Sequence, residues 1–351
     1  MLYLTYKVDP HDTLVGHVVG WLRTLARRMD SIEVVCLAAG PAELPPNVSV
    51  HSLCKERGAN RLARWLCFYR TVWGLRHQIE AVFCQFSPEY VIGVAPLARL
   101  CGWPITFWYT HRHVGLRLRL ATALADRVLT ATTDSFQLQT PKLRVIGHGI
   151  DTERFRPGPA QPAERPIVLA VGRRAPIKRY ELLIDATRIL TRDLGQNLQV
   201  RIVGGDEGSA PSDYARQLQQ RIDSAGLSDV VKLVGALPFD RVTAEYRRAS
   251  VHVNLCPTGG MDKAVLEGMA SGVPTLVRNE TFAPYLNEAG HGLVFAADEP
   301  RAVAEQIAAL LALSAAERAR LGQQLQQIAG DNFGQAAFIA RLAAAIAAPI
   351  P

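Results

Sequence analysis

The chain has 351 residues, with 39 Lys and Arg against 32 Asp and Glu, a formal net charge of +7, and 48% hydrophobic residues. At roughly 150 residues per domain, this length predicts two domains, each large enough to bury its own core. The composition excludes a disordered chain, a collagen and a disulfide-built miniprotein. The basic balance favours an anionic partner, and charge alone leaves nucleic acid, a phosphorylated ligand and an acidic lipid surface open.

The first half alternates short β-favouring apolar runs with helix-favouring segments, which is the pattern of βαβ units around a parallel sheet. We expect one doubly wound α/β domain over residues 1–157. Its predicted strands are Leu2–Tyr6, Ile32–Leu37, Ala81–Gln85, Ile105–Tyr109, Arg127–Ala131 and Leu143–Ile146.

A proline-rich stretch without periodicity follows, and residues 158–166 are predicted to form a linker. A second doubly wound domain is expected over residues 167–330. An Ala-rich helix over 331–351 is expected to return to the first domain. The predicted strands of the second domain are Ile167–Val171, Gln199–Val203, Val230–Val234, Val251–Leu255 and Thr275–Val277, and its helices include Tyr180–Leu190, Tyr214–Ala225, Val242–Ala249 and Lys263–Ala270.

The export and membrane signals are weak. Apolar runs such as Ile307–Leu313 fall far short of the roughly 18 residues that cross a bilayer. The start of the chain lacks the charged region and cleavage site of a secretory signal. The cysteines show no CxxC or CxxH spacing, so we expect reduced core thiols in a cytoplasmic protein.

Two cations follow the first strand of the second domain. Gly172 stands where the backbone must turn, and Arg173 and Lys178 come just beyond the carboxyl end of the strand. Guanidinium and ammonium groups placed there can bind a diphosphate. The alternative is a surface loop of a basic protein.

The loop after strand Val251–Leu255 is glycine-rich. Gly259 and Gly260 leave backbone N–H groups available, and Asp262 can cap a helix that starts near Lys263. Such a helix start binds anions. Glu267 lies one turn further, where its carboxylate can accept hydrogen bonds from a vicinal diol. The alternative is a surface pair of Lys263 with Glu267.

These segments resemble the signatures of the group 1 (family 4) retaining glycosyltransferases of GT-B fold, two Rossmann-like domains facing each other across a cleft. Residues 145–155 are similar to that family's Asn-Gly-(Val/Ile)-Asp-x-x-x-Phe segment. The resemblance implies sugar transfer from a nucleotide-diphosphate sugar, with retention of configuration and with no metal or other cofactor. It implies that Arg173 and Lys178 act on the diphosphate and that Glu267 holds the ribose.

The sequence departs from the family pattern in the donor loops. The first Glu of the family's Glu-x7-Glu motif is replaced by Gly259, while Gly260, Met261 and Asp262 stand for its Gly-Phe-Gly, whose amides meet the donor sugar. The N-terminal Gly-Gly loop common in the family is also absent, and Gly16 is the glycine expected to allow a close approach there. These departures keep two alternatives open: a non-catalytic nucleotide-sugar-binding protein and a sugar-nucleotide epimerase of the same fold.

The acceptor candidates lie in the first domain. His111, just after a strand, resembles the family's cleft histidine, and the resemblance implies that this domain faces a glycan or lipid-linked acceptor. Nucleic acid is not expected, since no nucleic-acid-binding motif occurs. A basic and aromatic helix is a candidate for contact with an anionic membrane, with core packing as the alternative; its residues are Arg61, Arg64, Trp65, Tyr69, Arg70 and Trp73.

Overall fold

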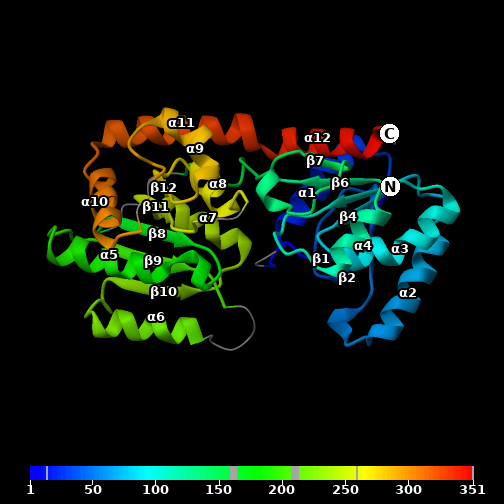
Figure 1. Ribbon diagram of the computed structural model, residues 1–351, viewed down its shortest axis with the longest axis horizontal. Coiled ribbons are helices and arrows are strands. Elements are labelled where there is room, and N and C mark those ends of the chain that lie inside the picture. Colours follow the sequence, from blue (N-terminus) through cyan, green and yellow to red (C-terminus); the bar gives the residue numbers. More distant parts are fainter. Residues whose placement is uncertain (13–14, 159–163, 207–212, 258–259, 297, 350–351) are drawn as a thin grey trace. The chain divides into compact units, whose positions relative to one another are not determined.

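A computed structural model describes residues 1–12, 15–158, 164–206, 213–257, 260–296 and 298–349 (Figure 1). The chain divides into two compact units. Unit 1 comprises Met1–Gly149 and Gln335–Pro351, and unit 2 comprises Ile150–Gly334. Among the described residues, no helix is both long and apolar enough to cross a membrane.

Unit 1 is built on a seven-stranded parallel sheet with the order β3-β2-β1-β4-β5-β6-β7. All six predicted strands form. The seventh, β3, was not predicted, because it is a short edge strand with polar residues and no fully buried side chain. The strands are β1 (Leu2–Val8), β2 (Ile32–Ala39), β3 (Val48–Ser52), β4 (Val82–Gln85), β5 (Ile105–Trp108), β6 (Arg127–Thr130) and β7 (Leu143–Val145).

The helices of unit 1 cover this sheet through apolar faces. Asn60 caps α2, because its side chain accepts a hydrogen bond from the Ala63 amide at 2.9 Å. Pro88 stands in the first turn of α3, where its missing N–H costs nothing. The helices are α1 (His17–Leu25), α2 (Arg61–Gly74), α3 (Pro88–Cys101), α4 (Leu116–Leu124) and α12 (Gln335–Ala347).

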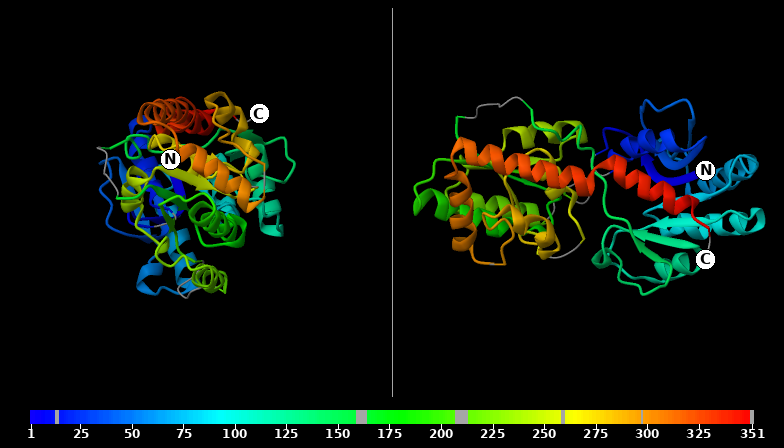
Figure 2. Two further views of the ribbon diagram at one scale, coloured as in Figure 1. Left: turned by 90° about the vertical axis from the view of Figure 1, so that its left-hand side faces the viewer. Right: turned by 90° about the horizontal axis from the view of Figure 1, so that it is seen from above.

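Helix α12 comes from the far end of the chain and packs on α1 (Figure 2). The rings of Trp21 and Phe338 lie 4.6 Å apart, and both residues are buried. The Gln335 amide donates to the Gly20 carbonyl at 2.9 Å and to the Thr24 hydroxyl at 2.7 Å. The last helix therefore belongs to the core of the unit that begins the chain.

Unit 2 is built on a five-stranded parallel sheet with the order β10-β9-β8-β11-β12. All five predicted strands form: β8 (Ile167–Val171), β9 (Gln199–Val203), β10 (Val231–Gly235), β11 (Val251–Asn254) and β12 (Thr275–Val277). The helices are α5 (Tyr180–Arg192), α6 (Asp213–Ser224), α7 (Phe239–Arg248), α8 (Lys263–Ala270), α9 (Ala283–Leu286), α10 (Pro300–Leu311) and α11 (Ala315–Phe333).

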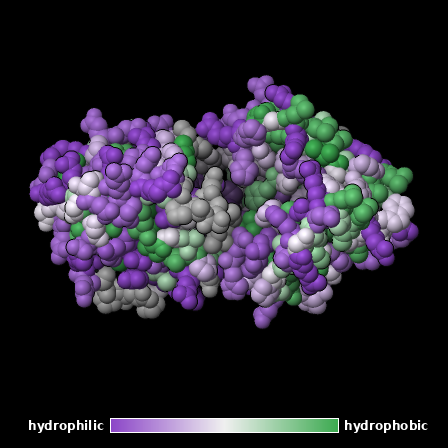
Figure 3. All heavy atoms as spheres, turned by 90° about the horizontal axis from the view of Figure 1, so that it is seen from below, coloured by the Kyte–Doolittle hydropathy of each residue, from purple (hydrophilic) through white to green (hydrophobic). Residues whose placement is uncertain are grey.

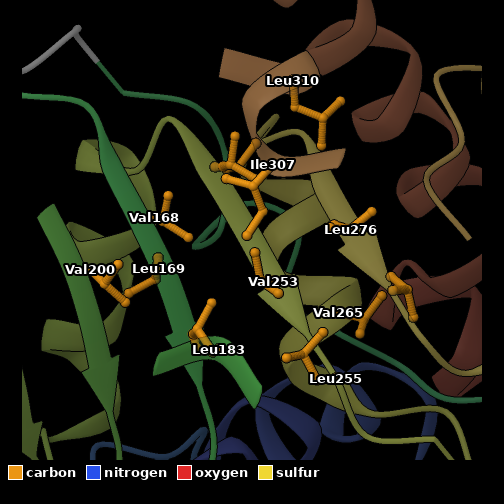
Figure 4. Packing of buried hydrophobic residues seen from close by; sticks show 14 of the residues in the cluster. Val168, Leu169, Leu183, Val200, Val253, Leu255, Val265, Leu276, Ile307 and Leu310 are labelled. Carbon is orange, nitrogen blue, oxygen red and sulfur yellow. The ribbon is translucent and has the colours of Figure 1, made fainter. Parts of the chain in front are cut away.

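The core of unit 2 joins its central strands to helices that follow them. Figure 4 shows Val168 of β8 and Val253 of β11 in the same buried cluster as Leu183 of α5, Val265 of α8 and Ile307 of α10. Helix α10 packs on α5, and α11 packs on α8. These contacts hold the loops that follow β8 and β11 on a rigid sheet.

The units divide at other residues than the sequence suggests. Ile150 and Phe155 are buried in the core of unit 2, so unit 2 begins before the proline-rich stretch rather than after it. At the other end, α11 continues to Phe333, whose ring lies 4.8 Å from that of Tyr285. The boundary there is Gly334 instead of residue 330.

The six cysteines are all free thiols, and two of those that are not buried, Cys67 and Cys101, still pack against the core of unit 1. Cys36, Cys84 and Cys256 are buried, as the sequence predicts. The other three, Cys54, Cys67 and Cys101, are half-buried.

Candidate active site

The candidate donor residues lie where the winding of unit 2 reverses. β9 and β10 extend the sheet on one side of β8, and β11 and β12 extend it on the other. In open α/β sheets, ligands bind outside the carboxyl ends of the strands at this reversal. The loops that follow β8 and β11 contain the cations and the helix start singled out from the sequence.

Glycines allow these loops to approach closely. Gly172 has φ +152°, and a Cβ there would lie 3.0 Å from Lys178 Cε and 3.1 Å from the Tyr180 hydroxyl. Gly204, after β9, has φ +149°, and its Cβ would lie 1.9 Å from the Gly172 carbonyl oxygen. Only glycine fits at Gly204 without moving the backbone.

Lys178 is held at the reversal by side chains from the other loop. Its ammonium forms an ion pair with Asp262, and Asn254 of β11 donates to the same carboxylate at 2.9 Å. Burial favours the neutral forms, but the mutual attraction outweighs it: the pKa of Lys178 is raised above its ordinary value and the pKa of Asp262 is lowered. A charged lysine is therefore fixed beside the start of α8.

The start of α8 is formed as the sequence predicts. Asp262 is the N-cap, and its other carboxylate oxygen accepts from the Ala264 amide at 3.2 Å. The helix runs over the predicted residues, Lys263–Ala270. The positive end of the α8 dipole and the charged lysine ammonium beside it both favour an anion here.

Glu267 is buried rather than on the surface. It is 8% exposed, and the Tyr246 hydroxyl lies 3.3 Å from its carboxylate. Burial raises the pKa of Glu267 to about 8, although the nearby Lys263 acts in the opposite direction. Burial likewise lowers the pKa of Lys263 to about 8. The alternative of a surface pair is therefore wrong.

The remaining donor candidates have different surroundings. Arg173 is exposed directly after Gly172, and Met261 is buried. Gly260 is half-buried, and its carbonyl accepts from the Asn279 amide at 3.4 Å. Gly259 lies outside the described residues.

Gly16 and His111 belong to unit 1. Gly16 is buried at the start of α1, and His111 is an exposed residue after β5. The Phe86 ring lies 6.2 Å from the rings of both His17 and His111. Phe86 has φ +66°, which is strained for a bulky residue, and strain of this kind concentrates at functional sites.

Helix α2 divides its apolar residues between two faces. Phe68 and Val72 are buried, and Trp65 is half-buried. Core packing therefore accounts for only one face. The exposed large apolar side chains on this helix are Leu62 at 70%, Leu66 at 64%, Trp73 at 45% and Tyr69 at 39%.

Sequence reasoning missed the residues that orient the site. Asn254 fixes the Asp262 carboxylate, and Tyr246 reaches Glu267 from another helix. The Tyr180 hydroxyl donates to the Gly172 carbonyl at 2.8 Å. The one signal was the polar Asn254 at the end of an apolar strand, since the partners of Tyr180 and Tyr246 depend on the fold.

A comparison with known protein families finds a match over the part of the chain that contains this site. Residues 151–327, half of the chain, match the family model described as "Glycosyl transferases group 1". The match lies within unit 2, which contains Lys178, Asp262 and Glu267.

Two curated relatives illustrate the similarity. A GDP-mannose-dependent alpha-(1-6)-phosphatidylinositol monomannoside mannosyltransferase of Mycobacterium tuberculosis is 28% identical over 267 residues, 67% of this chain and 67% of that protein. A D-inositol 3-phosphate glycosyltransferase of Kribbella flavida is 33% identical over 173 residues, 43% of this chain and 40% of that protein.

Solved structures share the architecture. Anabaena HepE in complex with UDP and glucose matches with a TM-score of 0.76 and 17% identity over 97% of both chains. WaaG, a glycosyltransferase involved in lipopolysaccharide biosynthesis, matches with a TM-score of 0.70 and 14% identity over 99% of this chain and 100% of that chain. The fold is therefore GT-B, two parallel-sheet α/β units in one chain.

Proposed function

We propose, from the premise that this chain belongs to the glycosyl transferases of group 1, that it moves a hexosyl group from a nucleotide-diphosphate sugar to a glycan or lipid-linked acceptor. The proposal includes retention of the anomeric configuration, as the family 4-like motifs imply. The observation that supports it most is the charged Lys178 fixed beside the start of α8 at the reversal of the sheet. Family membership favours transfer over the two alternatives, simple nucleotide-sugar binding and epimerisation.

The reaction separates the sugar from a nucleoside diphosphate, so negative charge grows on the leaving phosphate. Lys178 and Arg173 neutralise that charge, and the amides of α8 add to the effect. Asp262 positions the Lys178 ammonium and keeps it protonated. The proposal assigns no step to a metal ion or another cofactor.

Glu267 is assigned to the ribose of the donor. It lies on the turn of α8 after the anion site, so it can meet the nucleoside whose phosphates reach the helix start. A carboxyl group with a pKa near neutrality accepts a hydrogen bond from one hydroxyl and, when protonated, donates to the other. Glu267 is a binding group in this proposal, not the nucleophile.

The donor can be narrowed by experiment. The Mycobacterium tuberculosis relative is named as GDP-mannose-dependent, which makes GDP-mannose the first candidate here. UDP- and ADP-sugars are screened beside it by thermal stabilisation, because a ligand that binds the native state raises the melting temperature.

Turnover with the donor found tests the assignment of the cations. Lys178→Ala and Arg173→Ala are each expected to lower kcat about 100-fold or more, since they remove transition-state charge stabilisation. The assay contains EDTA, because the proposal needs no metal. Arg188→Ala, an exposed arginine on α5, is the matched control and is expected to retain full activity. Unchanged kcat in both site variants would refute the assignment.

We also propose that α2 brings unit 1 to an anionic membrane surface, where a lipid-linked acceptor would lie. Interfacial helices combine an apolar face bearing Trp with basic residues. The exposed side chains of Leu66 and Trp73 supply the first. Arg70, together with Arg76 two residues beyond the end of the helix, supplies the second. In Figure 3, green apolar residues stand among purple polar ones on the surface of unit 1.

Binding to lipid vesicles tests the proposed contact of α2 with a membrane. The wild-type chain is expected to sediment with phosphatidylglycerol vesicles at low salt and to be released as salt rises, because each basic residue near the surface contributes about 1 kcal/mol. A Leu66→Ser/Trp73→Ser variant is expected to lose most binding, whereas Leu100→Ser, an exposed leucine on α3, serves as the control. A wild-type chain that ignores such vesicles would show that the acceptor is reached without a membrane.

A further inference from the structure

Unit 1 has a cavity of about 290 Å³ at the carboxyl edge of its own sheet. Tyr6 reaches it from the end of β1, Leu37 from the end of β2, and Ser87 follows β4. The winding of this sheet reverses between β1 and β4. The cavity therefore occupies the place in unit 1 where open α/β sheets bind ligands.

The cavity is lined by more positive than negative charge. Arg61 and Arg64 of α2 and Arg117 of α4 line it, and Glu89 is its one acidic lining residue. Glu89 is already engaged, accepting from Arg117 at 2.6 Å and from Ser87 at 2.8 Å. Within the described part of the chain, neither Arg61 nor Arg64 has a carboxylate at ion-pair distance. The positive charge of Arg61 and Arg64 is therefore available to bind an anion.

The position of the two arginines supports this reading. Both stand in the first turn of α2, which has no acidic residue. The helix dipole disfavours cations at this end, so two arginines there oppose the stability of the helix. A bound anion would offset both the side-chain charge and the helix dipole.

The wall of the cavity also carries aromatic groups. The Trp65 indole is fixed against α3, since a Cβ on Gly93 would lie 2.4 Å from its ring. Tyr90 is 5% exposed, and its hydroxyl has no hydrogen-bond partner among the described residues. A buried hydroxyl of this kind costs free energy unless a ligand or water satisfies it. The aromatic side chains of Trp65 and Tyr90 therefore form part of the cavity wall.

We propose that this cavity binds a phosphorylated sugar or polyol, with Arg61 and Arg64 on the phosphate and Trp65 and Tyr90 on the ring. Guanidinium groups match phosphate oxygens, and aromatic faces pack on the apolar faces of sugars. The volume is near the lower end of the roughly 300–1,000 Å³ range of ligand sites, which suits one monosaccharide unit. This inference rests on the proposed function, because it names the chemistry of the acceptor of that reaction.

Direct binding to the full chain tests the inference without turnover. Isothermal titration compares glucose 6-phosphate and mannose 6-phosphate with the unphosphorylated sugars. The phosphorylated sugars are expected to bind at least about tenfold more tightly. An Arg61→Ala/Arg64→Ala variant is expected to weaken their binding about tenfold or more, whereas Arg28→Ala, an exposed arginine elsewhere in unit 1, leaves it unchanged. Circular dichroism checks that each variant is folded.

Two further measurements complete the test. One distinguishes a lipid headgroup from a soluble sugar phosphate, and the other distinguishes failure of this inference from failure of the proposed function. Competition by phosphatidylinositol vesicles but not by equally anionic phosphatidylglycerol vesicles identifies a lipid headgroup, and absence of competition identifies a soluble sugar phosphate. Nucleotide binding to unit 2 is titrated in parallel. A chain that binds nucleotide but does not prefer phosphorylated sugars, or whose double variant binds like the wild type, overturns this inference alone. A chain that binds sugar phosphate but no nucleotide overturns the proposed function.

Discussion

Glu267 shows how one buried residue couples ligand binding to stability. A carboxyl group with 8% exposure is expensive to ionise, which is why its pKa lies near 8 instead of the ordinary 4.5. A folded-state pKa above the unfolded value stabilises the protein fully below pH 4.5, and that stability is lost as pH rises to about 8. Lys263, with a lowered pKa, acts in the opposite direction only above about pH 8.

Glu267→Gln is therefore expected to flatten the pH dependence of stability. Glutamine stays neutral, so the loss between pH 5 and pH 8, worth roughly 1.4 kcal/mol for each pKa unit, is largely removed. Melting temperatures at both pH values check this, with the exposed Glu288→Gln as a control. Nucleotide binding at neutral pH should weaken in the Glu267 variant by about 0.5–1.5 kcal/mol, the value of a hydrogen bond between neutral groups. An equal effect of the substitution on stability at pH 5 and pH 8 would contradict the raised pKa of Glu267.

At the level of elements, helix α8 packs very closely against strand β11. A Cβ on Gly268 would lie 2.7 Å from Nδ1 of His252 and 2.9 Å from the Thr275 hydroxyl. His252 is fully buried, and burial lowers its pKa to about 3, so it packs as a neutral ring. The glycine lets α8 lie close enough to the sheet to present Asp262 and Glu267.

Gly268→Ala is expected to destabilise the protein by about 1–3 kcal/mol, because neighbouring groups must move to admit the methyl group. Gly330→Ala in α11 is the matched control: nothing lies within 4 Å of the added atom, and the change should be neutral or stabilise by about 0.5–1 kcal/mol. Urea unfolding measures both. Similar free energies of unfolding for the two variants would show that α8 does not pack tightly against the sheet at Gly268.

The elements themselves follow from local pattern, whereas the contacts between them do not. Apolar runs predicted every strand except β3, which is a polar edge strand. The Asp262 cap was predictable because capping depends on residues two or three positions apart. The Lys178 ion pair spans 84 positions, and the unusual backbone of Phe86 has no sequence signal. Such features can be predicted only when the order of the strands in the sheet is known.

At the scale of the whole chain, unit 1 is assembled from both ends of the sequence. Arg127 of β6 is 1% exposed and donates to the carbonyl oxygens of Ile346 and Ala348. Arg341 donates to the Ile146 carbonyl at 2.8 Å. Without α12, the Arg127 guanidinium loses these partners, and Trp21 loses the Phe338 ring that covers it.

A chain ending at Gly334 is therefore expected to lose the cooperative unfolding of unit 1 and keep that of unit 2. Calorimetry of the truncated and full chains checks this, since two units with separate cores can unfold in separate transitions. A synthetic peptide of residues 335–349 added in excess should restore the lost transition. A truncated chain with both transitions intact would show that α12 is dispensable.

The late return of α12 also sets an order for folding during synthesis. Residues 150–334 are synthesised before Gln335, so residues 1–149 lack their last helix until all of unit 2 has been made. Domains usually fold in the order in which they are made. Here unit 1 is begun before unit 2 and completed after it, and the apolar face of α1 around Trp21 stays uncovered during the synthesis of a whole domain. Chaperone binding to nascent chains should accordingly be longest at α1.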